Sequence, residues 1–148
     1  MAREETTKRT AQESLNAFTA EIGRQQDLVY GAALFFECLT VLHDGQPAVI
    51  ETYRKQYRNI ISMGNATVDR ANALLEAARA DNSRCNEVDA FTFTPFSEHP
   101  APTEMVRRAE TLISAYRQIF LERPLSEEFT HGELLQLVDA ASDALAAE

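Results

Sequence analysis

The side chains suited to metal binding or nucleophilic catalysis are few and scattered in this chain of 148 residues. The histidines are His43, His99 and His131, and the cysteines are Cys38 and Cys85. A metal site or a catalytic set needs several such groups on one face of the fold. The histidines fall at a helix end, in a loop and at a helix start. We therefore expect no metal, no cofactor and no catalytic residues, and we favour a protein that is not an enzyme.

A second kind of chemistry, charge recognition, is indicated by a basic patch made of Arg54, Lys55 and Arg58. The patch stands out because the chain carries a net charge of −9. Arg54 and Arg58 are four residues apart and share one face of a helix, interleaved with Tyr53 and Tyr57. Three uses are open for the bases: ion pairs with another helix, an acidic protein partner, or a nucleic acid. The negative net charge disfavours nucleic acid.

Length and composition indicate one globular domain, with 45% hydrophobic and 25% charged residues. No apolar run approaches the length of a membrane span, and the charged start does not lead into a signal-peptide core. We therefore expect a soluble, cytoplasmic protein without membrane contact. The arginine-rich, lysine-poor and alanine-rich composition suggests a bacterial or phage source.

Hydrophobic residues at a 3–4 repeat, as in coiled coils, predict an all-α, four-helix bundle-like fold. The expected organisation is a flexible N-terminus over residues 1–10 and one helical domain over 11–148, with two long antiparallel helices at about 11–43 and 48–82, and two shorter ones at about 103–123 and 127–147. Gly45 and Pro47 separate the long helices, because glycine ends helices and proline suits a first turn. Thr130 and Glu133 match a capping box, and Ser126 is a second possible start for the last helix.

The middle of the first long helix carries two apolar lines instead of one. The first line contains a single polar residue, Gln25. The second line is made of Leu28, Gly31, Phe35, Cys38 and Leu42. A helix that is apolar on most of its circumference must be covered on most of it. The second line therefore lies either inside the bundle or in the interface of a homodimer.

The connection over residues 83–102 is expected to be non-helical, because three prolines interrupt it. It contains Phe91, Phe93 and Phe96 in an alternating pattern. Three structures are open for it: an extended segment whose phenylalanines dock on the bundle, an edge that pairs with another chain, or a mobile lid. A connection of this length is uncommon unless it has a function.

These observations favour a non-catalytic interaction protein, namely an adaptor, regulator or inhibitor that acts through helical surfaces. We expect a homodimer, with a heterologous protein as a possible partner. The alternative is a small-molecule-binding or enzymatic helical domain with a pocket under residues 85–102. A nucleic-acid-associated regulator is a minor alternative that depends on the basic patch alone.

Overall fold

The computed structural model describes residues 10–93, 100–124 and 127–146, with the backbone alone for 100–103. Within these ranges every regular element is helical: α2 (Ala11–Leu42), α3 (Pro47–Ala80), the 3₁₀ turn η1 (Asn82–Arg84), α4 (Cys85–Ala90), α5 (Pro100–Ile119) and α6 (His131–Ala146). The predicted all-α class is confirmed. The expected flexible terminus lies, except for Thr10, outside the described residues.

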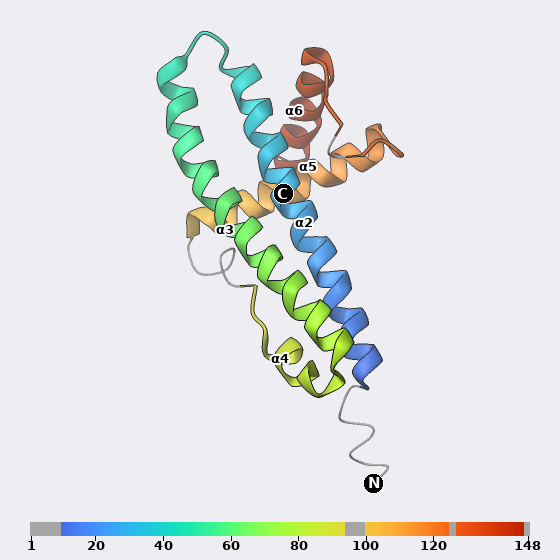
Figure 1. Cartoon of the computed structure of the whole chain (residues 1–148). Coiled ribbons are helices and arrows are strands. Elements are labelled where there is room, and N and C mark those ends of the chain that lie inside the picture. The colour runs from blue at the N-terminus through green and yellow to red at the C-terminus, as the bar shows by residue number, and fades with distance from the viewer. Residues whose placement is uncertain (1–9, 94–99, 125–126, 147–148) are drawn as a thin grey trace.

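The helices pack around a long hairpin rather than as four parallel rods. Helices α2 and α3 run antiparallel, α5 crosses behind α2 at a steep angle, and α6 lies beside the upper part of α2 (Figure 1). Helix α3 packs chiefly against α2, with α4 and η1 near its lower end. The predicted four-helix bundle is not confirmed, because α5 runs across the hairpin instead of along it.

The ends of the long helices follow from local chemistry. The Thr10 side chain accepts a hydrogen bond from the Glu13 N–H and caps the start of α2. Gly45 has a φ of 85°, in the left-handed region that glycine adopts without strain. Pro47 occupies the first turn of α3, where a missing N–H costs no helical hydrogen bond. The predicted break between the long helices is therefore confirmed.

The connection after α3 is more helical than expected. Residues 82–90 form η1 and α4, and α5 begins at Pro100 instead of Thr103. The prolines do not prevent this start, because the first N–H groups of a helix have no partner within the helix. Helix α5 also ends at Ile119, before the predicted end at residue 123.

The start of α6 is set by the predicted capping box. The Thr130 N–H donates to Glu133 Oε1 at 2.9 Å, and the Glu133 N–H donates to Thr130 Oγ1 at 3.2 Å. This cap places the start at His131, after the predicted boundary at residue 127. Arg123 pairs with Glu133 and lies over the Phe129 ring, 4.2 Å from its centroid. Phe129 also packs against Tyr116 of α5, with ring centroids 5.9 Å apart, so the described part of this segment contacts both helices.

The apolar core is divided into a lower and an upper cluster. The lower cluster joins the first half of α2 to the second half of α3 and to α4, through Leu15, Phe18, Ile22, Val68, Ala71, Leu75, Ala78, Cys85 and Val88. The upper cluster joins α2 from Val29 onward to α3, α5 and α6. Gln25 and Leu28 are both buried and lie between the two clusters. The middle of α2 is thus the place where the core is interrupted.

Helix α5 approaches α2 closely at Gly31. A Cβ atom on Gly31 would lie 2.8 Å from Ile113 Cδ1 and 3.2 Å from the Ala109 carbonyl oxygen. A Cβ atom on Gly23, on the same helix, would meet no atom within 4 Å. Glycine is therefore required for packing at position 31 and not at position 23.

Substitution of the two glycines should have opposite effects on stability. We expect Gly31→Ala to lower the free energy of unfolding by about 1–3 kcal/mol, because Ile113 and the α5 backbone must shift. Gly23→Ala should raise it by about 0.5–1 kcal/mol through helix propensity. Urea denaturation followed by circular dichroism measures both. Equal stabilisation by the two substitutions would contradict the close approach of α5.

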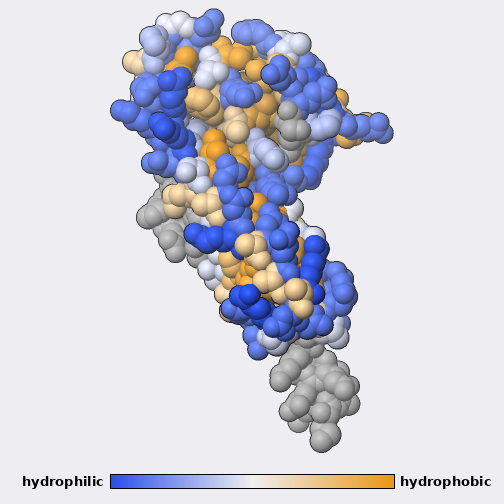
Figure 2. Space-filling view, in the orientation of Figure 1, coloured by the Kyte–Doolittle hydropathy of each residue, from blue (hydrophilic) through white to orange (hydrophobic). Residues whose placement is uncertain are grey.

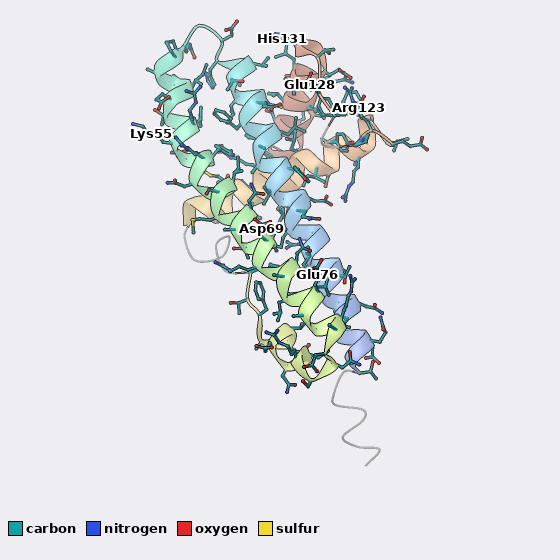
Figure 3. All side chains as sticks on the ribbon, in the orientation of Figure 1. Lys55, Asp69, Glu76, Arg123, Glu128 and His131 are labelled. Carbon is teal, nitrogen blue, oxygen red and sulfur yellow. The ribbon has the colours of Figure 1, made fainter. Side chains whose placement is uncertain are left out.

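The capping box predicts a defined pH dependence. The Thr130 N–H, and with it Arg123, holds the pKa of Glu133 below its usual value. The stabilisation by ionised Glu133 is therefore complete above its unfolded-state pKa and is lost as the pH falls through the lower folded-state pKa. Glu133→Gln should have a lower urea midpoint than the wild type at neutral pH. In acid, where Glu133 is protonated, the two midpoints should become equal. Glu76→Gln, at an exposed position of α3 (labelled in Figure 3), is the control and should show no such pH-dependent difference.

Candidate functional site

The second apolar line of α2 is almost entirely core. Leu28 is 3% exposed, Phe35 9% and Cys38 0%, and Gly31 is buried against α5. Leu42 is the exception at 52% exposure. The assignment of the first four residues to a homodimer interface is corrected, because other helices of the same chain cover them. Helices α5 and α6 pack against this second apolar line and bury it, as an α2 that is apolar on most of its circumference requires.

Phe35 and Leu42 distinguish core from surface experimentally. The Phe35 ring stacks on Tyr57 with centroids 6.3 Å apart. Phe35→Ala should therefore cost about 3–5 kcal/mol of unfolding free energy. Leu42→Ala, on the surface, should change it by no more than about 0.5 kcal/mol. Denaturation together with size-exclusion chromatography tests this, and loss of association without loss of stability in Phe35→Ala would contradict the core assignment.

The three bases of the predicted patch are exposed on α3 and make no ion pair to another helix within the described residues. Arg54 pairs with Glu51, on the same helix, at 3.3 Å. Lys55 and Arg58 have no ion pair in the described part of the chain, and Lys55 points away from the hairpin (Figure 3). The explanation by ion pairs between helices is therefore not supported for this patch.

The tyrosines interleaved with the bases are occupied by packing. Tyr57 is 1% exposed, and burial raises the pKa of its hydroxyl to about 12 against the opposing effect of the Arg108 guanidinium. Tyr53 is half-buried, with its ring 5.6 Å from that of His43. These rings are thus structural, and stacking on nucleic-acid bases would have to displace them.

A groove of about 630 Å³ runs along α3 beside the basic patch. Its lining includes Phe36 from α2 and Arg54, Tyr57, Arg58, Ile61 and Asp69 from α3, and we call it the α3 groove. Phe36 and Ile61 are half-buried hydrophobic residues that pack against the upper cluster. Figure 2 shows hydrophobic residues between the arms of the hairpin in its upper half, framed by hydrophilic ones. The α3 groove thus combines an apolar floor with two arginines at one end.

A second hollow, of about 610 Å³, lies between α2, α4, residues 91–93 and α5, and we call it the α2–α4 cavity. The Phe18 ring lies 5.4 Å from Phe91 and 5.7 Å from Phe93. Of the three structures left open for the connection, these contacts agree with docking on the helices for Phe91 and Phe93. Phe96 lies outside the described residues.

The polar side chains of the α2–α4 cavity were missed as a set by the sequence analysis. Gln25 is 4% exposed, and its Nε2 donates to Glu21 Oε1 at 2.8 Å. Its Oε1 is buried and has no hydrogen-bond donor within the described residues. Arg24, which also lines the cavity, pairs with Glu110 at 2.6 Å and with Glu21 at 3.4 Å. The sequence signal that could have identified this cavity is Gln25, the single polar residue in the first apolar line of α2.

The cysteines and histidines do not assemble a reactive centre in the part of the chain that the structure describes. No group of three or more His, Cys, Asp or Glu side chains suited to a metal ion occurs there. Burial raises the pKa of the Cys38 thiol to about 12, which keeps it protonated and unreactive. Cys85 is buried in the lower cluster, His131 is exposed at the start of α6, and His99 lies outside the described residues.

No protein-family model matches the sequence, and neither curated proteins nor solved structures yield a match. Among the described residues, no helix combines the length and the apolar character needed to cross a lipid bilayer. The α3 groove and the α2–α4 cavity are the features from which we infer a function.

Proposed function

We propose that the protein is a non-catalytic interaction protein whose α3 groove binds an acidic amphipathic helix of a partner protein. The supporting observation is that Arg54 and Arg58 lie at one end of an apolar floor and pair with no other helix in the described part of the chain. In helix-in-groove recognition the apolar face of the incoming helix supplies burial and its charged flank supplies orientation.

Other exposed arginines of this protein pair across helices, which those of the groove do not do within the described residues. Arg24 of α2 pairs with Glu110 of α5 at 2.6 Å, and Arg117 of α5 pairs with Asp27 of α2 at 2.5 Å. Both pairs join two helices at the crossing of α5 over α2. Arg54 has only an intrahelical partner among the described residues, and such an exposed pair contributes little to stability. The groove arginines are therefore available for an external carboxylate.

The apolar floor supports the same proposal. Phe36 and Ile61 are only half-buried, because α3 packs chiefly against α2 and no third helix of the described residues lines this flank. An apolar stripe on a partner helix would complete their burial, while its carboxylates would pair with the guanidinium groups. Asp69 lies 11 residues beyond Arg58, about 16 Å along the helix. We therefore expect the acidic end of the partner helix to lie over the arginines, away from Asp69.

Two other partners are less well supported. A second copy of the chain was expected from the second apolar line of α2, but four of its five residues are buried in the same chain. A nucleic acid would meet few bases on a protein of net charge −9, and the neighbouring tyrosines are committed to packing. The small-molecule alternative has a separate supporting observation, the α2–α4 cavity beneath residues 88–93.

The proposal predicts a crosslink that depends on the groove arginines. A photoreactive amino acid at Ser62, an exposed position in the groove, should crosslink to a partner protein in a lysate of the native cell. The crosslinked peptide should be an acidic amphipathic segment, and its yield should fall severalfold with Arg54→Glu/Arg58→Glu and at high ionic strength. Arg70→Glu/Arg79→Glu is the control, since it makes the same charge change on α3 outside the groove lining.

Three results would contradict the proposal. A crosslink that is equally sensitive to both double variants would reflect net charge alone. A crosslink only to a second copy of the chain would support the homodimer instead. A crosslink to nucleic acid that the groove variant abolishes would support the nucleic-acid alternative.

A further inference from the structure

We propose that the α2–α4 cavity binds a small molecule with an apolar body and a primary ammonium group. This inference does not depend on the α3 groove, because the two sites share no lining residue. The volume of about 610 Å³ is in the usual range for small-molecule sites. The chemical nature of the ligand's head group and that of its body are inferred from two separate sets of lining residues.

The body of the ligand is assigned from the walls of the cavity. Phe18 and Phe91 belong to the lower cluster or pack against it, whereas Val106 of α5 packs against the upper cluster. All three line the cavity, together with Leu28 between the clusters. A hydrophobic ligand would therefore bridge the interruption in the core. Aromatic rings on one wall favour an aromatic or aliphatic body of modest size.

The need for a hydrogen-bond donor follows from Gln25. Its amide nitrogen is already used by Glu21, while its buried Oε1 has no donor in the described part of the chain. Buried acceptors in proteins are normally paired, so a ligand N–H that met this oxygen, after rotation of the Gln25 side chain into the cavity that it lines, would satisfy an unmet group. A carboxylate head group has no proton to donate at neutral pH and is therefore disfavoured.

The positive charge of the head group follows from the acids in the lining. Glu21 and Asp89 both face the cavity, and Asp89 also accepts a hydrogen bond from the buried Ser14 hydroxyl at 3.2 Å. Arg24 is the single base in the described lining, and Glu110 and Glu21 already pair with it. The phenylalanine faces add a further attraction for a cation. An ammonium group thus meets both the hydrogen-bond and the charge requirement.

The test uses three probes with one body and different head groups: phenethylamine, 2-phenylethanol and phenylacetate. Isothermal titration calorimetry and thermal shift on the full chain should show binding of one phenethylamine, at least tenfold weaker binding of the alcohol, and none of the acid. Equal affinity for amine and alcohol would overturn the charge assignment. No heat and no shift with phenethylamine up to its solubility limit would overturn the site.

Variants then assign the binding to these residues. Gln25→Leu should raise the melting temperature of the free protein, because it removes an unpaired buried acceptor, and should weaken phenethylamine binding about tenfold. Glu21→Gln/Asp89→Asn should weaken it at least as much. Glu76→Gln, a charge change at an exposed residue outside the cavity lining, is the control and should leave it unchanged. Weakening by Glu76→Gln to the same extent would show that the amine binds only through net charge.

Two further measurements keep the inference falsifiable if a variant fails to fold. Titration of the wild-type protein with phenethylamine, followed by NMR, should shift the ring resonances of Phe18, Phe91 and Phe93. Shifts confined to other residues would overturn the assignment. Arg54→Glu/Arg58→Glu should bind the amine as the wild type does, which separates failure of this site from failure of the α3 groove.

Discussion

The arrangement of this protein depends on the close crossing of α5 over α2 at Gly31. The absence of a side chain at Gly31 lets Ile113 and the α5 backbone approach α2 directly. Arg24–Glu110 and Arg117–Asp27 also join the two helices, through α2 residues that precede Gly31. Because α5 crosses α2 instead of running beside it, its cover is concentrated on the upper half. The apolar surplus of α2 is buried there, within the chain.

The same crossing leaves two places incompletely covered. The lower half of α2 relies on α4 and residues 91–93, and the core is interrupted between this cover and α5, where the α2–α4 cavity lies. The upper half of α3 packs chiefly against α2, so its outer flank keeps the α3 groove. Both candidate sites therefore have one geometric origin, which is a helix that covers only part of a long hairpin.

The two sites differ in charge and should not compete for one ligand. The α3 groove presents Arg54 and Arg58 on a chain of net charge −9, which favours an acidic partner. The α2–α4 cavity presents Glu21 and Asp89 with one arginine already paired, which favours a cation. A protein that carried both functions could bind a partner helix and a small amine at the same time, because the lining residues are separate.

Local sequence determined the helices, and tertiary structure decided what covers them. Gly45 and Pro47 set the hairpin turn, and Thr130 with Glu133 set the start of α6, because these effects act within a few residues. The 3–4 repeat also identified Phe35 and Cys38 as residues that need cover, but periodicity reports only that a face is apolar. Whether that cover came from α5 or from a second subunit depended on contacts distant in sequence. Within the described residues, the acceptor of Gln25 without a donor and the open flank of α3 likewise follow from packing between distant segments, which periodicity does not report.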